Sequence, residues 1–321
     1  MKKVEKKLHR LKGSQLLRDL CSETNFSLSH FVQPIFINEN MLDRDEITGL
    51  KNNFVMSIDK SLQQIDEDIN KGVRNFLLFI TPSKKNSTSF NLDFHQKAIS
   101  SIKNRFKDDI NLWADVCLCS LTDHGHCCLF DDDESINLEK TLKEISNIAL
   151  SYTEAGADII APSDMMDGRT LSIRKKLDES NFLMTPIISY STKFSSNFYG
   201  PFRDAASSAP SFGDRKKYQL DYRSQTEAIR ASIRCADEGA DMLMVKPGMT
   251  SIDLIDKIKE KTHLMVGAYQ VSGEYAGICL SEEKGLLNLN EALKETWHVM
   301  RRAGAQYIIT YGARLAKEIG F

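Results

Sequence analysis

The 321-residue sequence lacks the features that mark several classes of protein. No apolar run approaches the roughly 20 residues that a membrane span needs, and the basic residues 1–7 are not followed by the apolar stretch and cleavage site of a signal peptide. A net charge of −2 gives no general attraction to nucleic acid or anionic membranes. We therefore expect a cytoplasmic protein that binds neither nucleic acid nor membranes.

A disulfide framework is also absent from the pattern. The cysteines number seven, which is odd, and three of them are crowded together, which fits a reducing compartment and metal binding better than disulfides. No change in composition marks a second domain. Residues 1–30 are polar and basic and could not form a core alone, with Leu16, Leu17 and Leu20 as signs of a short helix. We expect them to form an arm that docks on something else, such as another subunit.

What the chain does contain is a recurring unit: an amphipathic helix, a glycine and a short apolar run. Leu62, Ile65 and Ile69 share one helical face and are followed by Gly72 and the apolar residues 75–80. Glycine takes the left-handed turn after a helix at no steric cost, and the next segment enters a buried parallel strand. The unit recurs before Gly156, Gly239 and Gly304. In the helix before Gly239 we expect Ile229 and Ile233 to face inward, and we expect Asn290 to cap the helix before Gly304.

Eight strand candidates follow from this pattern, centred near residues 33, 77, 115, 160, 188, 243, 266 and 308. Strands that alternate with helices predict a parallel sheet, and eight of them predict closure into a (β/α)8 TIM barrel over residues 31–321. An open doubly wound sheet is the alternative, but no glycine-rich phosphate fingerprint follows any of the strands. In a barrel, the chemistry lies at the carboxyl ends of the strands.

Cys117, Cys119 and Cys127 give the clearest metal signal. Alternation along a strand puts the first two side chains on one face, and the loop that contains Gly125 can return Cys127 to them. Three thiolates suit zinc and leave its fourth tetrahedral position open, as in a catalytic site. The alternatives are three ordinary buried thiols, or a structural zinc site whose fourth ligand is one of His124, His126 and Cys128.

Lys193 and Lys246 give the second signal, because they end consecutive strand candidates that would lie about 4.8 Å apart in a barrel. Two ammonium groups held so close in a partly desolvated cavity weaken each other's hold on a proton. A neutral lysine attacks ketones and forms a Schiff base. Either lysine alone could equally be a solvated charge at the rim, so the argument depends on the pair.

The segment at about 194–220 is long and rich in serine, glycine and proline. Long loops of this kind are usually functional lids or disordered. This one carries Arg203 and Arg215, whose guanidinium groups could bind a substrate carboxylate in bidentate geometry. On spacing alone, a flexible and solvated basic loop explains the same pattern.

Seven motifs stand in order from about residue 31 to the C-terminus and resemble those of the porphobilinogen synthase (5-aminolevulinate dehydratase) family. They are DVCLC at 115–119, HGHC at 124–127, APSDMMDG at 161–168, YGPFRDA at 199–205, GDRK at 213–216, MVKPG at 244–248 and YQVSGEY at 269–275. The resemblance implies a barrel with an N-terminal arm, assembled as a homo-octamer. It also implies the condensation of two 5-aminolevulinate molecules to porphobilinogen, with loss of two waters, in the biosynthesis of haem and other tetrapyrroles.

The resemblance also implies a role for each matching residue. Lys246 would form a Schiff base with the substrate that supplies the propionate side, and Lys193 with the one that supplies the acetate side. Asp115 would orient or accept protons, and the three cysteines match the zinc-dependent branch of the family. The carboxylate-binding residues would be Arg203 and Arg215 for one substrate, and Ser272 and Tyr311 for the other.

The sequence departs from the family pattern at two positions. Cys128 stands where the family usually has glycine, and Ala231 stands where many bacterial members carry the glutamate of an allosteric magnesium site, which argues against such an ion here. Another Schiff-base lyase of the class I aldolase type is the alternative enzyme, although one lysine and no thiol cluster would suit it better. A zinc-stabilised scaffold would leave the lysine pair unexplained.

Overall fold

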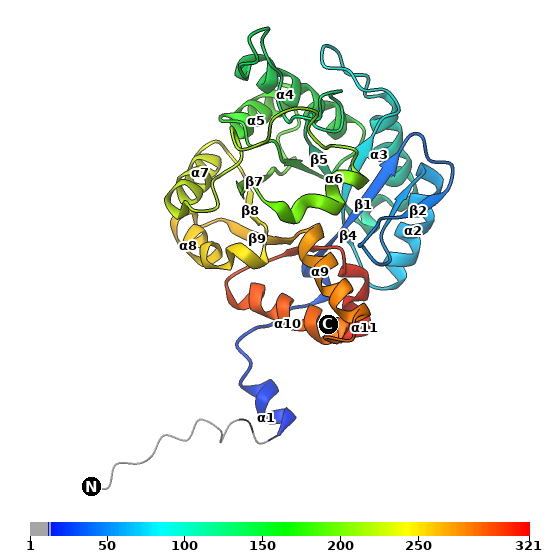
Figure 1. Cartoon of the computed structure of the whole chain (residues 1–321), viewed down its shortest axis with the longest axis vertical. Helices are drawn as coiled ribbons and strands as arrows, with labels where there is room; N and C mark the ends of the chain where they lie inside the picture. Colours follow the sequence, from blue (N-terminus) through cyan, green and yellow to red (C-terminus); the bar gives the residue numbers. More distant parts are fainter. Residues whose placement is uncertain (1–11, 13) are drawn as a thin grey trace, which may run out of the picture.

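The computed structural model describes residues 12 and 14–321, in which eight parallel strands form a barrel surrounded by helices (Figure 1). Neighbouring strands follow the order β6-β5-β4-β1-β10-β9-β8-β7. These strands confirm all eight candidates from the sequence. They are β1 (Phe31–Asn38), β4 (Asn75–Thr81), β5 (Asn111–Val116), β6 (Ile159–Pro162), β7 (Ile188–Lys193), β8 (Met242–Lys246), β9 (Met265–Gln270) and β10 (Ile308–Thr310).

The two ends of this order, β6 and β7, meet and close the barrel. Across this seam the described residues form a single bridge, between Ile160 and Ile187. The predicted (β/α)8 barrel is therefore confirmed, with one join much weaker than the others. An additional hairpin, β2 (Arg44–Glu46) and β3 (Phe54–Met56), pairs antiparallel and extends the sheet beside β1.

Helices cover the outside of the barrel (Figure 1). On β4, Phe76, Leu78 and Ile80 pack with the helices, whereas Leu77 and Phe79 belong to the other apolar cluster. Burial on both faces explains why the strand is continuously apolar. The helices are α1 (Gln15–Leu20), α2 (Ile58–Asn70), α3 (Asp93–Phe106), α4 (Leu138–Glu154), α5 (Arg169–Glu179), α6 (Gly200–Ala205), α7 (Gln225–Asp237), α8 (Ile252–Thr262), α9 (Ser272–Glu283), α10 (Leu289–Arg302) and α11 (Ala316–Ile319).

One local expectation held in part and another was wrong. Ile229 packs against the core cluster, but both Ile229 and Ile233 are only partly buried. α7 packs on β7 through small residues, with the Ser232 hydroxyl 2.9 Å from that of Thr192. The cap of α10 is Asn288, not Asn290, and its side chain accepts a hydrogen bond from the backbone of Glu291. The buried residues of α7 are Ala228, Ala231, Ser232 and Cys235.

The predicted short helix of the arm is present as α1, which projects away from the barrel (Figure 1). Residues 1–11 and 13 of the predicted arm lie outside the described residues. The chain that follows α1 is tied to α10, where Arg301 donates to the carbonyl of Asn25 at 3.2 Å. Within residues 12 and 14–321, no helix combines the length and apolar character needed to cross a membrane.

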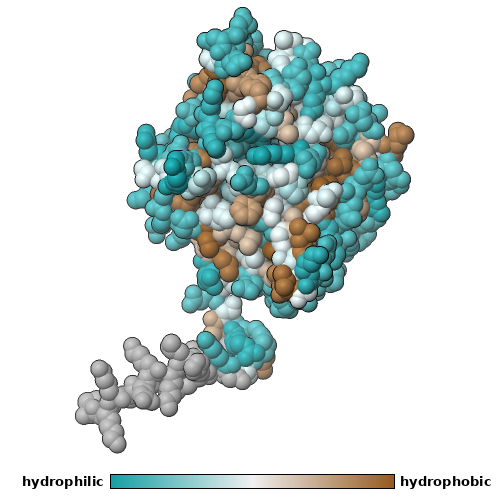
Figure 2. Space-filling view, viewed as in Figure 1, coloured by the Kyte–Doolittle hydropathy of each residue, from teal (hydrophilic) through white to brown (hydrophobic). Residues whose placement is uncertain are grey.

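The segment at 194–220 is more ordered than a loop. It contains the 3-10 helix η4 (Asn197–Tyr199) and then α6, which lies across the barrel in Figure 1. Phe202 of α6 packs edge-on against Phe79 of β4, with ring centroids 4.9 Å apart. The face shown in Figure 2 is mostly hydrophilic, with hydrophobic atoms in separate patches. The segment therefore covers one end of the barrel with apolar contacts beneath a polar surface.

Candidate functional site

Lys193 and Lys246 lie side by side at the carboxyl ends of β7 and β8. Each is the last residue of its strand, and the two are register partners in the parallel pair. Their exposed fractions are only 6% and 4%. Lysine is almost never buried so fully unless its amine is paired or used. The structure thus brings together the two lysines that the sequence placed on neighbouring strand ends.

Aromatic rings enclose the amine of Lys246. Its Nζ lies 4.0 Å from the ring centroid of Tyr269, 5.0 Å from that of Phe202 and 5.3 Å from that of Tyr199. Burial among these rings, and then the charge of Lys193, hold the pKa of Lys246 well below its usual value. Both causes disfavour the charged form, so the amine spends more time neutral and nucleophilic than that of a surface lysine.

Lys193 makes a different set of contacts. Its Nζ donates a hydrogen bond of 2.5 Å to the carbonyl of Ser163, which follows β6. The same Nζ lies 5.8 Å from the ring centroid of Tyr190, and the Nζ of Lys246 lies 5.4 Å from that centroid. The two amines therefore share the Tyr190 ring as a neighbour at one end of the barrel.

The three predicted metal ligands converge. The sulfur atoms of Cys117, Cys119 and Cys127 all lie within 4.8 Å of one another and are buried. Hydrogen bonds from the Cys117 and Cys119 thiols hold the pKa of Cys127 well below its usual value. Three convergent, buried sulfur ligands fit a zinc ion with an open fourth position.

The sequence left three candidates for a fourth protein ligand. The Nδ1 of His124 accepts from the backbone N–H of His126 at 3.0 Å. Both ring nitrogens of His126 have partners, the Tyr218 hydroxyl at 3.0 Å and the Phe212 carbonyl at 2.9 Å. Cys128 packs in the apolar cluster between strands and helices, and not with the other three thiols. Burial raises the pKa of Cys128 to about 12, so its sulfur stays protonated. Among the described residues, the group of convergent ligand atoms consists of the three cysteine sulfurs.

Asp115, near the end of β5, lies close enough to Lys193, Lys246 and Cys127 for their charges to affect its pKa. Burial raises the pKa of Asp115 to about 6, against the opposing effects of Lys193, a hydrogen bond from Ser163 and Lys246. Its Oδ1 is buried and has no hydrogen-bond partner among the described residues. An unpartnered oxygen at this place can accept a proton or a hydrogen bond from a bound molecule.

Arg203 and Arg215 both lie in the covering segment, but their surroundings differ. Arg215 is 4% exposed, and its Nη2 donates to the carbonyl of Gly125 at 2.9 Å and to that of Ser208. Arg203 is half-buried and makes one long hydrogen bond of 3.5 Å to the carbonyl of Ser196. The proximity of Arg215 adds to burial in lowering the pKa of Arg203. Two guanidinium groups this close suit an anion between them.

Ser272 is the first residue of α9, and Tyr311 directly follows β10. The Ser272 hydroxyl accepts from the backbone N–H of Phe202 at 3.1 Å and donates to the carbonyl of Phe198 at 3.2 Å. The Tyr311 hydroxyl lies 3.2 Å from that of Tyr269, whose ring contacts Lys246. Both hydroxyls are therefore close to the groups that surround Lys246.

The sequence reasoning missed Glu274 as a residue of the site. Its carboxylate accepts from the backbone N–H groups of Met249 at 2.9 Å and Thr250 at 3.2 Å, and from that of Val271 at 2.8 Å. It thereby joins the loop after Lys246 to the loop that carries Ser272. Burial raises the pKa of Glu274 to about 7 against these hydrogen bonds. Only its place three residues into α9 hinted at a capping role.

The sequence and the structure are both similar to those of known proteins of one family. A model of the family "Delta-aminolevulinic acid dehydratase" matches residues 5–319. The delta-aminolevulinic acid dehydratase of Helicobacter pylori (strain J99) is 44% identical over 314 residues, covering 96% of this chain and 97% of the relative. That of Bacillus subtilis (strain 168) is 39% identical, covering 96% of each chain. The crystal structure of the Toxoplasma gondii ME49 enzyme, in complex with its product porphobilinogen, matches with a TM-score of 0.94 and 35% identity, covering 98% of this chain and 91% of that one.

Proposed function

Because the chain belongs to the delta-aminolevulinic acid dehydratase (porphobilinogen synthase) family, we propose that Lys193 and Lys246 bind its two substrate molecules covalently. The chain is a hydro-lyase that condenses two molecules of 5-aminolevulinate to porphobilinogen in tetrapyrrole biosynthesis. The observation that carries the proposal is the register pairing of the two buried lysines at the ends of β7 and β8. A class I aldolase type of enzyme and a non-enzymatic scaffold are excluded by the family.

Each covalent step is the same reaction. A neutral lysine amine attacks the ketone of 5-aminolevulinate, the carbon–oxygen bond breaks, and one water leaves as the imine forms. Lys246 binds the molecule that supplies the propionate side, and Lys193 binds the molecule that supplies the acetate side. Holding both ketones on one protein makes the condensation intramolecular. The high effective molarity then lowers the activation barrier by several kcal/mol.

The two amines are held differently. The environment that lowers the pKa of Lys246 favours the neutral form of its amine. The amine of Lys193 is held by the Ser163 carbonyl and is aimed toward the same end of the barrel. Asp115 lies beside both amines and orients or accepts protons as the imines form and as waters leave.

The three cysteines hold zinc in this proposal. The fit rests on three convergent, buried sulfur atoms and on the engagement of the other candidate ligands. When bound, zinc supplies a Lewis acid and lowers the pKa of a bound water. Tyr218 helps to place the loop, since its hydroxyl contacts His126 at 3.0 Å and accepts from the backbone of Cys127 at 3.4 Å.

The substrate carboxylates are bound by residues of the covering segment and of the opposite strands. Arg203 and Arg215 bind one carboxylate, and Ser272 and Tyr311 bind the other. The segment at about 194–220 acts as a lid that excludes water from the imines. Ser272 belongs to both functions, because its hydroxyl bonds η4 and α6 of this segment.

Three further features stay predictions. The chain assembles as a homo-octamer through an arm at residues 1–30, for which the 82% and 80% exposure of Leu16 and Leu20 on α1 offers apolar contact surface. The protein acts in the cytoplasm. It has no allosteric magnesium site at Ala231, where the side chain offers no ligand.

Borohydride trapping tests the covalent steps. Reduction of the protein with borohydride in the presence of 5-aminolevulinate should add the mass of substrate less one water plus two hydrogens, and peptide mapping should locate the adduct on Lys246 and Lys193. Lys246→Arg replaces the amine with a guanidinium group, which cannot form an imine, so it should lose both the Lys246 adduct and activity. Lys60→Arg, a surface change at a residue paired with Asp43, should alter neither.

The same experiment separates the roles from the family activity. Full turnover in Lys246→Arg, or adducts found on other lysines only, would show that the roles are wrongly assigned although the enzyme belongs to the family. Metal analysis of the untreated protein gives a readout for the cysteines that does not depend on activity.

A further inference from the structure

The seam between β6 and β7 is held differently from the other joins of the barrel. Every other neighbouring pair in the described barrel has at least two register pairs, whereas this seam has the single bridge between Ile160 and Ile187. The hydrogen bond that accompanies it runs from the N–H of Ile160 to the carbonyl of Pro186, at the amino end of the strands. At the carboxyl end, β6 finishes with Pro162, which has no N–H to donate.

Arg169, the first residue of α5, fills this gap with side-chain hydrogen bonds. It is completely buried. Its Nη2 donates to the Ser189 hydroxyl at 3.2 Å and the Tyr190 carbonyl at 3.1 Å, both on β7. Its Nη1 donates to the carbonyl of Met166, in the loop that follows β6, at 3.0 Å. One planar guanidinium group thus spans the seam on the side where the main chain does not.

Asp164 supplies the opposite charge. Its Oδ2 lies 3.7 Å from the Nε of Arg169, and both side chains are completely buried. Its Oδ1 accepts from the backbone N–H of Met166 at 2.7 Å, which shapes the turn after β6. A buried ion pair adds little net stability compared with apolar residues of similar size, but it specifies one geometry. The pair is thus better explained by the geometry that it imposes than by the stability that it adds.

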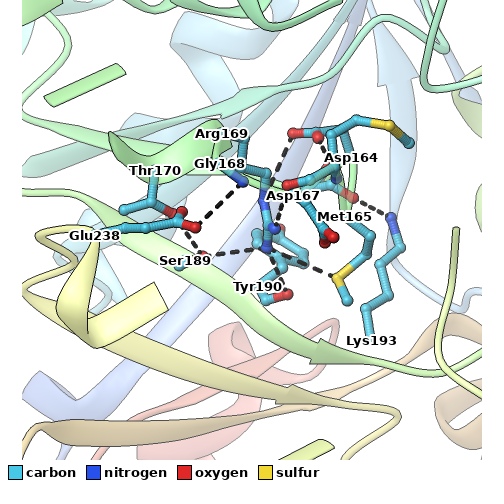
Figure 3. Close-up of polar contacts among 12 residues, drawn as sticks. Asp164, Met165, Asp167, Gly168, Arg169, Thr170, Ser189, Tyr190, Lys193 and Glu238 are labelled. Carbon is cyan, nitrogen blue, oxygen red and sulfur yellow. Dashed lines mark hydrogen bonds and ion pairs between the residues drawn. The ribbon is translucent and has the colours of Figure 1, made fainter. Parts of the chain in front are cut away.

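The geometry in question is that of Lys193. This residue lies three positions after Tyr190 on β7, and its Nζ donates to the carbonyl of Ser163, the residue before Asp164 (Figure 3). The lysine amine and the guanidinium group therefore connect the same strand to the same loop. A shift of the β6 loop relative to β7 would move the acceptor of the Lys193 amine.

We propose that Arg169, paired with Asp164, is a positioning residue that closes the β6–β7 seam at its carboxyl end and sets the place of the Lys193 amine. This rests on the proposed function of Lys193 as a Schiff-base lysine. Arg169 acts through β7 and the β6 loop and does not touch the substrate. Lys246 also neighbours the Tyr190 ring of β7, but it is held by β8 and enclosed by the rings of Tyr199, Phe202 and Tyr269 from other elements, so it depends less on this clasp than Lys193 does.

The unequal dependence of the two lysines on the clasp gives a selective test. Arg169→Lys keeps a positive charge beside Asp164 but cannot span from Met166 to Ser189 and Tyr190 with a planar fork. After borohydride reduction with 5-aminolevulinate at limiting time, peptide mass spectrometry gives the amounts of adduct at Lys193 and Lys246. We expect the Lys193 adduct to fall about tenfold, as for the loss of one hydrogen bond to a charged group, and the Lys246 adduct to change less than about twofold.

Two further variants complete the test. Arg174→Lys lies on the same helix, where Arg174 also donates to backbone carbonyls, those of Thr185 and Phe182, but away from the Lys193 end of β7. It should leave both adducts unchanged. Asp164→Asn keeps the size of the side chain and an acceptor for the Met166 N–H, and removes the charge. If Arg169→Lys does not fold, as judged by circular dichroism, Asp164→Asn should show the same selective loss at Lys193.

Each outcome decides the matter. A selective loss at Lys193 supports the positioning role. Equal losses at both lysines would reduce Arg169 to a purely structural residue, and unchanged adducts would remove it from the reaction; both overturn the proposal. If the unaltered protein formed no adduct at Lys193, the proposed function of that lysine would fail, which is a separate result from the failure of the clasp.

Discussion

The exchange of Gly273 for alanine is the sharpest test of the covering segment as a lid. Gly273 is the second residue of α9, directly after Ser272, and η4 approaches it closely. A Cβ at this position would lie 2.7 Å from the carbonyl oxygen and 2.8 Å from the Cα of Phe198. Both neighbours are backbone atoms, so the clash is relieved only if the segment moves away from α9.

The size of the effect follows from these contacts. Overpacking of this kind costs about 1–3 kcal/mol, and the two hydrogen bonds of Ser272 to Phe198 and Phe202 contribute roughly 1 kcal/mol each when they are made. If the lid opens to relieve the clash, about 2 kcal/mol is taken from the closed state, which lowers kcat/KM roughly 30-fold. The barrel itself should unfold at nearly the same temperature, because the segment moves and the core does not.

The assay is the rate of porphobilinogen formation by the colour test for the pyrrole, with thermal unfolding and limited proteolysis of residues 194–220 measured on the same samples. Gly277→Ala is the matched control, since it lies on the same helix and a Cβ there meets no atom within 4 Å. We expect Gly273→Ala alone to be slow and to be cleaved faster in the segment. A kcat/KM within twofold of the control would refute both the close approach and its importance for the reaction.

Three other predictions concern the metal site, the clamp between loops and the response to acid. Cys119→Ser should lose its bound zinc on gel filtration while Cys128→Ala keeps it, as measured by metal content, and equal metal in both would contradict the three-cysteine site. Glu274 joins the loop after Lys246 to the loop that carries Ser272. Glu274→Gln should lower activity about tenfold and also lower Tm, because the new amide N–H group would face a backbone N–H that now donates to the carboxylate. Unchanged kinetics would show that Glu274 does not position Lys246. His95 is buried, and burial lowers its pKa to about 4. Between pH 7 and pH 5 this histidine therefore takes up a proton in the unfolded chain but not in the folded chain, which lowers the free energy of unfolding by about 2 kcal/mol. Urea unfolding at the two pH values should show this loss in the protein and not in His95→Phe, and equal pH dependence in both would rule out this role for the histidine.

Local patterns were sufficient to predict most of the fold. A helix, a glycine and an apolar run repeat along the chain, and Gly72, Gly156, Gly239 and Gly304 all have the positive φ that the pattern required. Helix caps such as Ser57 and Ser224 bond within three residues of themselves. Such features depend on near neighbours in the chain, so they can be recognised without the tertiary structure.

Two of the site's signals were also readable, because each depends on a simple geometric rule. Residues two apart on a strand share a face, which joined Cys117 to Cys119, and the ends of neighbouring parallel strands lie together, which joined Lys193 to Lys246. The roles of individual residues beyond these two groups came from resemblance to a family and not from spacing.

The tertiary structure alone decided how the reactive groups are held. Phe202 lies over Lys246 because α6 crosses the barrel. The side chains of Glu274 and Arg169 bond backbone groups that lie well away from them in the chain, those of Met249 and Tyr190. A backbone N–H or carbonyl looks the same in every residue, so no pattern of side chains announces such a contact. The weak seam between β6 and β7 also could not be predicted from the sequence. The register of the two strands that close a barrel depends on all the other strands around it.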